Sequence, residues 1–148
     1  MILVTQTATL PSGLSTLARC AEQEGFRFLQ RLVADFETGQ NRFAQAGEAL
    51  FQARDGEKLV GVGGLNQDPY SRHPRVGRVR RLYVHPDYRK LGVARQLMQS
   101  IEQVGRDLFV ELRLRTDTAG AAAFYVRLGY TTLDTEEQAT HSKVLRLA

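Results

Sequence analysis

The spacing of apolar and polar residues divides this chain of 148 residues into short strands and helices. From 28 to 36 the apolar positions recur at helical spacing and Gly39 follows, which predicts a helix and its stop. Two strand-like runs, 48–53 and 58–65, flank an Asp-Gly pair that is typical of a hairpin turn. The same patterns predict strands near 2–7, 77–84, 111–115, 130–133 and 141–147, and helices near 12–24, 92–105 and 121–129. Strands interspersed with helices indicate an α/β fold, and Ser12 is a candidate cap for the first helix.

Composition agrees with one compact domain over residues 1–148. Hydrophobic residues make up 43% of the chain, enough for a core, and no linker or internal repeat interrupts it. The first ten residues lack the basic start of a signal peptide, and no run approaches the roughly 18 apolar residues of a membrane span. We therefore expect a cytoplasmic protein that does not bind membranes. Cys20, the one cysteine, has no internal disulfide partner, and its helical apolar setting favours packing over nucleophilic chemistry.

The segment 79–94 is the most informative part of the chain, because an apolar strand passes through a short turn into an amphipathic helix. Gly92 has no Cβ, so an anion can approach the main chain where the first helical turn leaves N–H groups unpaired. The positive end of the helix dipole favours the same anion, and Arg89 and Lys90 add two positive charges there. The order of strand, basic turn and helix predicts a phosphate site. The six residues 89–94 taken alone would also fit an ordinary helix start.

Two motifs give the chain a resemblance to the GNAT superfamily of N-acetyltransferases. The first, Arg/Gln-x-x-Gly-x-Gly/Ala, grips the pyrophosphate of acetyl-coenzyme A in that family and is matched by Arg89, Gly92 and Ala94. The second, Tyr-x-x-Leu-Gly-Tyr/Phe, is matched by Tyr125, Leu128, Gly129 and Tyr130. With the strands around them, the resemblance covers residues 48–147 and identifies no subfamily.

The resemblance implies a single-domain, mixed and mostly antiparallel sheet that splays between its fourth and fifth strands, with helices on both faces. The pantetheine arm of acetyl-coenzyme A would lie in the gap as an added strand would. The expected cofactor contacts are Leu82, Tyr83 and Val84 for the pantetheine and Arg89, Lys90, Leu91, Gly92, Val93, Ala94 and Arg95 for the pyrophosphate. The apolar side chains of Leu82 and Val84 would also be explained by burial in the core alone. Thr118 stands where the family often has an Asn that bonds the cofactor, although its shorter side chain reaches less far.

Catalysis in the family is direct attack of an amine on the thioester, which requires a proton donor for the departing thiolate. Tyr125 matches the residue that has this role, and a phenol of pKa about 10 is protonated at neutral pH. The alternative is a core tyrosine, because Tyr125 also belongs to an apolar helical stripe. The base is open among His73, Asp68, Glu111 and water, and the chain has no spacing typical of a metal site.

Positive charge is concentrated in residues 72–115, which carry 11 Arg and Lys against 4 Asp and Glu. Coenzyme A is a polyanion and no nucleic-acid-binding motif accompanies the arginines, so we expect no nucleic acid partner. The resemblance implies an acceptor site built from about 22–48 and 66–75, with dimerisation left open. The flanking arginines favour an acceptor that carries a carboxylate or phosphate over a polyamine, unless they serve coenzyme A or the outer face of the sheet. The competing function is a catalytically weak coenzyme A-binding sensor or regulatory homologue.

Overall fold

The computed structural model of the protein describes residues 1–134 and 136–146. Its strands are β1 (Ile2–Thr7), β2 (Ala49–Asp55), β3 (Lys58–Gln67), β4 (Val76–Val84), β5 (Glu111–Leu114), β6 (Thr131–Thr132) and β7 (His141–Val144). Its helices are α1 (Leu14–Gln23), α2 (Phe28–Thr38), α3 (Val93–Gly105) and α4 (Ala119–Arg127), with a 3-10 turn, η1 (Pro86–Tyr88), before α3. The elements expected from the sequence therefore form, and the expected end of the last strand at Leu147 lies outside the described residues.

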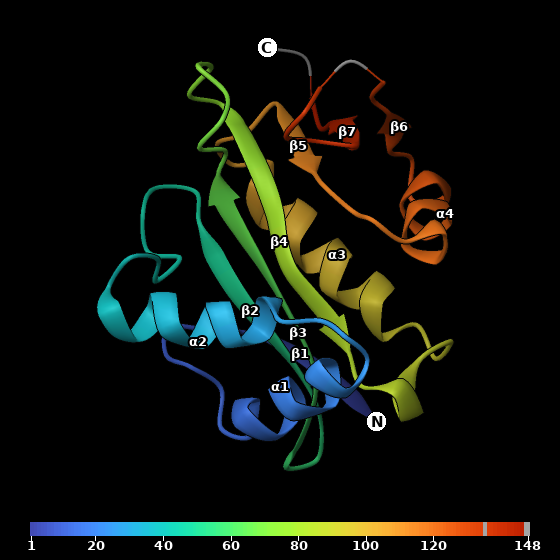
Figure 1. Cartoon of the computed structure of the whole chain (residues 1–148). Coiled ribbons are helices and arrows are strands. Elements are labelled where there is room, and N and C mark those ends of the chain that lie inside the picture. Colours follow the sequence, from blue (N-terminus) through green and yellow to red (C-terminus); the bar gives the residue numbers. More distant parts are fainter. Residues whose placement is uncertain (135, 147–148) are drawn as a thin grey trace.

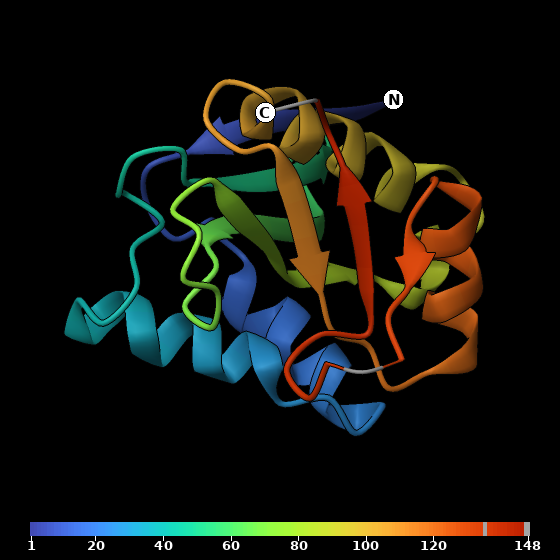
Figure 2. The ribbon, with the colours of Figure 1, turned by 90° about the horizontal axis from the view of Figure 1, so that it is seen from above.

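One mixed sheet contains the seven strands in the order β1-β2-β3-β4-β5-β7-β6. Neighbouring strands are antiparallel except β4 and β5, which run parallel. Helices α1 and α2 lie on one face of the sheet and α3 lies on the other (Figures 1 and 2). This arrangement confirms the expected α/β fold with a mostly antiparallel sheet and helices on both faces.

Two apolar cores fill the space between the sheet and its helices. The core on the α3 side contains Phe51, Val79, Leu97, Ile101, Phe109, Leu112 and Tyr125 among its buried residues. The core on the α1 and α2 side contains Leu17, Leu29, Leu32, Phe43, Val62 and Tyr83. Val79 and Leu82 pack in the α3-side core. Because successive strand residues face opposite sides, Arg78 and Arg80, the two neighbours of Val79, face the α1 and α2 side.

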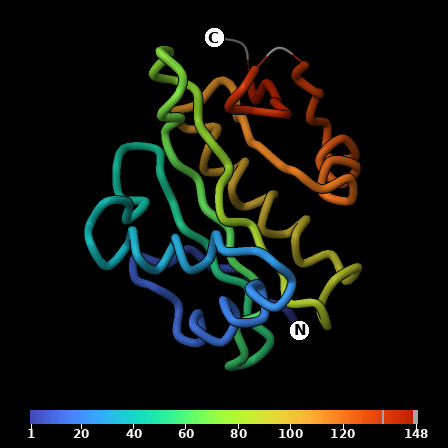
Figure 3. The backbone as a smooth tube through the Cα atoms, in the orientation of Figure 1, coloured from blue at the N-terminus to red at the C-terminus, as the bar shows by residue number. Residues whose placement is uncertain are grey.

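Strands β4 and β5 pair over only three residues and then part. Val76, Gly77 and Arg78 are in register with Glu111, Leu112 and Arg113, and β4 continues alone on this side to Val84. Figure 3 shows the chain of β5 leading away from β4 toward α4, while β4 continues toward the turn before α3. The splay expected between the fourth and fifth strands is therefore confirmed.

A β-bulge in β4 lies within the parted region. Val62 of β3 is opposite Tyr83, and Gly64 is opposite Arg80, so two steps along β3 correspond to three along β4. Arg81 takes up the extra residue with a φ of 60°, in the left-handed region that side chains rarely adopt. The bulge turns the edge of β4 just where β5 has left it.

The start of α1 differs from the expectation. Gly13, with a φ of 88°, is the N-cap residue, and no side chain caps the helix. The hydroxyl of Ser12 instead accepts a hydrogen bond from Arg54 Nη2 at 3.0 Å. The prediction of Ser12 as the cap was wrong, because a contact with a residue 42 positions away takes its oxygen.

Candidate active site

The turn between β4 and α3 presents unpaired backbone N–H groups on an open surface. Gly92 is the N-cap residue of α3, with a φ of 85° and no side-chain cap, and a Cβ built on it would meet nothing within 4 Å. The first N–H groups of α3 therefore have no helical acceptor and face open space. In this turn Lys90, Leu91 and Arg95 are exposed, Ala94 is half-buried and Val93 is buried in the core. An anion at this place would meet main-chain donors and the helix dipole.

The guanidinium of Arg89 is engaged with Glu24, which follows α1. Its two terminal nitrogens donate to the Glu24 carboxylate at 2.7 and 2.6 Å, and its Nε donates to the carbonyl of Val84 at 3.2 Å. The hydrogen bonds from Arg89 hold the pKa of Glu24 below its usual range. Glu24 therefore balances the positive charge that Arg89 was expected to add to the turn. The pair instead ties the turn to the segment between α1 and α2.

The three residues expected along the pantetheine face different sides of the sheet. Leu82 is half-buried against the α3-side core and Val84 is buried there. Tyr83 points to the α1 and α2 side, where its hydroxyl donates to Glu24 and its ring lies 5.4 Å below the guanidinium of Arg89. A ligand between β4 and β5 could therefore meet Tyr83 only through its backbone.

Helix α4 begins with a side-chain cap and carries Tyr125 into the core. Thr118 is the N-cap residue, and its Oγ1 accepts the N–H of Ala121 at 3.2 Å. Capping of the helix is enough to explain a threonine at position 118, with no need for a ligand. The hydroxyl proton of Thr118 is not used by the cap and can still donate a hydrogen bond. The cap also fixes the start of the helix that holds Tyr125.

Tyr125 is 7% exposed, and burial raises the pKa of its hydroxyl. Its ring lies 5.6 Å from that of Tyr130 and 6.4 Å from that of His141, between centroids. Within residues 1–134 and 136–146 the Tyr125 hydroxyl makes no hydrogen bond, and it is not among the fully buried atoms that lack a partner. The oxygen therefore reaches accessible space as a neutral donor.

His141 is a neighbour of Tyr125 that the sequence did not reveal. It is 4% exposed on β7, and its Nδ1 lies 2.8 Å from Thr140 Oγ1. In the sequence it stands in an ordinary edge-strand pattern. Only the pairing of β7 with β5, opposite Leu114, brings it beside α4.

The three candidate bases are separated and already engaged. His73 lies in an exposed loop, where its Nδ1 accepts the N–H of Arg75 at 3.1 Å. Asp68 is buried 3.6 Å from Arg78 Nη1, and Glu111 accepts from Arg113 at 2.8 Å. The structure brings none of them together with Tyr125 through a hydrogen bond.

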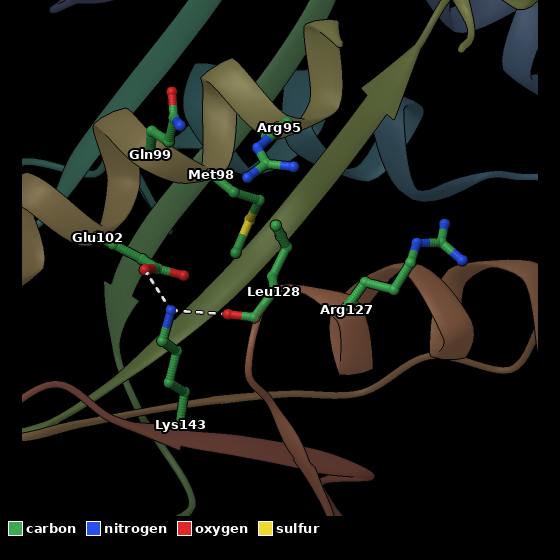
Figure 4. A pocket seen from close by; sticks show the side chains of 7 residues that line it. All are labelled: Arg95, Met98, Gln99, Glu102, Arg127, Leu128 and Lys143. Atoms are coloured by element: carbon green, nitrogen blue, oxygen red, sulfur yellow. Dashed lines mark hydrogen bonds and ion pairs between the residues drawn. The ribbon is translucent and has the colours of Figure 1, made fainter.

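A hollow of about 190 Å³ lies between α3 and the end of α4. Lys143 extends from β7 and donates to Glu102 on α3 and to the carbonyl of Leu128, both at 2.8 Å (Figure 4). Tyr130 donates to the same carboxylate at 3.0 Å. These bonds connect the end of α4 and the start of β6 to α3.

The described residues offer no cluster of three or more His, Cys, Asp or Glu side chains that could hold a metal ion. None of the helices in 1–134 and 136–146 is long and apolar enough to span a bilayer.

Solved structures of other proteins have a fold similar to that of this chain. A crystal structure of a protein assigned as an acetyltransferase, from Exiguobacterium sp. 255-15, has a TM-score of 0.87 at 24% identity, over 97% of this chain and 93% of that one. A GNAT-family acetyltransferase from Staphylococcus aureus Mu50 has a TM-score of 0.76 at 14% identity, over 99% and 100%. A protein from Klebsiella pneumoniae assigned as an acyl-CoA N-acyltransferase has a TM-score of 0.68 at 21% identity, over 98% of each chain. These likenesses show a shared fold.

The sequence itself carries the family assignment. A profile of the Acetyltransferase (GNAT) family matches residues 15–130, which include the β4–α3 turn and Tyr125. The parted β4 and β5 strands and the open N-terminus of α3 are the features that the motifs led us to expect. The chain therefore belongs to the GNAT family of acetyltransferases.

Proposed function

We propose that this protein transfers an acetyl group from acetyl-coenzyme A to a primary amine of a small molecule or peptide. The observation that carries the proposal is the end of β4–β5 pairing at Arg78 and Arg113. Beyond it, β4 offers an unpaired edge that leads directly to the open N-terminus of α3. An extended amide-containing arm followed by a pyrophosphate matches this order of a strand edge and an anion site.

The pyrophosphate would bind the N–H groups at the start of α3. Support comes from Gly92, where nothing lies within 4 Å of a built Cβ, and from the exposed cations Lys90 and Arg95. The pantetheine would run along β4 past Leu82 and Val84, and Tyr83 would contribute only its backbone. Thr118 would remain a helix cap that can also donate its hydroxyl proton.

The reaction we propose is direct attack. The amine nitrogen forms a bond to the acetyl carbonyl carbon, the bond between that carbon and sulfur breaks, and the electron pair leaves on sulfur. Tyr125 donates its proton to the thiolate and regains a proton from water. Its unbonded hydroxyl supports this role, and its raised pKa keeps the donor neutral at neutral pH. Asp68 and Glu111 are already paired with arginines, so we assign the proton lost by the amine to water.

Binding calorimetry with acetyl-coenzyme A tests the cofactor site. Gly92→Glu places a carboxylate and a side chain where the pyrophosphate would lie, and we expect at least tenfold weaker binding, about 1.4 kcal/mol. Gly56→Glu is the matched control, because Gly56 also has a positive φ of 61° and open space around it but lies in the β2–β3 hairpin. Equal affinity of the two folded variants would contradict this placement.

An acceptor screen tests the activity itself. The protein and acetyl-coenzyme A are incubated with free amino acids, amino sugars, polyamines and peptides, and release of the thiol is followed with a thiol-reactive dye. We expect release that depends on the amine. Tight binding of acetyl-coenzyme A without release for any amine would support a coenzyme A sensor instead.

A further inference from the structure

A second hollow, of about 410 Å³, opens on the α1 and α2 side of the sheet. Its lining comes from Asp68 and Tyr70 after β3, Arg78 on β4, Arg113 on β5 and residues 136–139 before β7. Arg78 and Arg113 face this side because their strand neighbours pack into the α3-side core. The hollow therefore lies on the face of the sheet opposite to the N-terminus of α3.

The hollow contains a buried cation with an unused donor. The Arg78 side chain is 8% exposed, and its Nη2 donates to the carbonyl of Gln138 at 2.6 Å. Its Nη1 lies 3.6 Å from Asp68 Oδ1 without a hydrogen bond. In the described part of the chain, this nitrogen is the one buried side-chain nitrogen or oxygen that lacks a partner. A buried donor left unpaired in this way is costly, so an acceptor atom is missing here.

Tyr70 covers the guanidinium from the solvent side. The Tyr70 ring centroid lies 4.8 Å from Arg78 Cζ, and Tyr70 itself is 53% exposed. An aromatic ring in this position holds the planar guanidinium in one orientation.

Charges of both signs lie near the unused donor. Burial lowers the pKa of Arg78, Asp68 opposes this change, and the nearby charges of Arg80 and Arg115 lower the pKa further. Asp68 is the acidic lining residue that contacts the guanidinium, and the other two acidic lining residues, Glu136 and Glu137, are exposed. A carboxylate from a ligand would supply an acceptor for Nη1, whereas Arg113 is already paired with Glu111.

We infer that this hollow binds the acceptor substrate, and that the acceptor is an amine carrying a carboxylate that accepts a hydrogen bond from Arg78 Nη1. This inference rests on the proposed acetyl transfer. Arg78 is the last residue of β4 that pairs with β5, so a carboxylate held there leaves the amine of the same molecule beside the parted strand edges. The acetyl donor would approach those edges from the α3 side, and the two substrates would meet between the strands.

The test compares matched substrates on the wild-type protein. Each of a set of L-amino acids is assayed against its own carboxamide by thiol release, with spermidine as a polyamine. Rates are expressed per concentration of unprotonated amine, because the carboxylate changes the pKa of the amine. We expect kcat/KM at least tenfold higher for the acids than for the amides or spermidine. Equal values, or a preference for spermidine, would overturn the inference.

Variants then test the assignment to Arg78. In Arg78→Met we expect the ratio of acid to amide kcat/KM to fall toward one, whereas Arg106→Met, which removes an exposed arginine on α3, should leave the ratio unchanged. If Arg78→Met does not fold, Arg78→Lys takes its place as the variant. The comparison of substrates on the wild-type protein decides the substrate class in either case. Calorimetry with acetyl-coenzyme A separates the two failures. Binding together with equal kcat/KM for acids and amides overturns only this inference, whereas no binding overturns the proposed function.

Discussion

Replacement of Tyr125 and of Tyr130 by Phe should separate catalysis from stability. Both side chains belong to the same buried core and their rings lie 5.6 Å apart, but their hydroxyls have different surroundings. The Tyr125 hydroxyl makes no hydrogen bond within the described residues, whereas Tyr130 donates to the buried carboxylate of Glu102 at 3.0 Å. Each substitution removes one oxygen from the same kind of side chain, so each serves as the control for the other.

The magnitudes follow from those surroundings. Tyr125→Phe breaks no bond of the fold, so the free energy of unfolding should change by less than about 0.5 kcal/mol. It removes the proton donor for the thiolate, and loss of a general acid lowers the chemical step about 10²-fold, or about 2.7 kcal/mol. Tyr130→Phe leaves the Glu102 carboxylate without one of its donors, which should cost about 1–3 kcal/mol of unfolding free energy.

Urea unfolding and single-turnover thiol release measure the two effects. We expect Tyr125→Phe to unfold like the wild type and to react slowly, and Tyr130→Phe to unfold earlier and to react at a similar rate when folded. Because burial raises the pKa of Tyr125, no loss of rate from its deprotonation should appear below pH 10. Normal single-turnover rates in Tyr125→Phe would show that Tyr125 only packs and would refute the proposed acid.

Two further predictions concern the scaffold of the site. Gly77→Ala would place a methyl group 2.6 Å from Phe109 Cδ2 where β4 meets β5, and the overpacking should cost about 1–3 kcal/mol in urea unfolding, whereas an unchanged midpoint would contradict the close approach. The hydrogen bonds from Arg89 hold the pKa of Glu24 below its usual value of 4.5, so its contribution to stability is full above that value and is lost as the pH falls through the lowered pKa. Thermal unfolding between pH 6 and 3 should therefore show a smaller loss for Glu24→Gln than for the wild type, and parallel losses would argue against the pair.

Local pattern was enough to predict the elements of the fold. The helical spacing from 28 to 36, the Asp-Gly hairpin and the glycine before α3 all act within a few residues, and α2, the β2–β3 hairpin and the N-cap Gly92 formed as expected. The splay of β4 and β5 followed from the resemblance, since no local signal marks where two strands part.

Contacts between distant residues could not be predicted in this way. Arg89 was expected to face a phosphate, but its partner Glu24 lies 65 positions away in the sequence. His141 reaches Tyr125 only through the pairing of β7 with β5, and Arg78 donates to the carbonyl of Gln138, 60 positions away. One sequence shows that such charged groups exist, but only the folded chain determines which of them are already neutralised.

The central claim is transfer of an acetyl group to nitrogen by this chain. It is tested most directly with acetyl-coenzyme A labelled with ¹³C in the acetyl group, by mass spectrometry of the amines that release thiol in the acceptor screen. The account predicts labelled N-acetyl product in a one-to-one ratio with free thiol, at a rate that falls about 10²-fold in Tyr125→Phe. Thiol release with the label recovered as acetate, or at the same rate with and without amine, would contradict it.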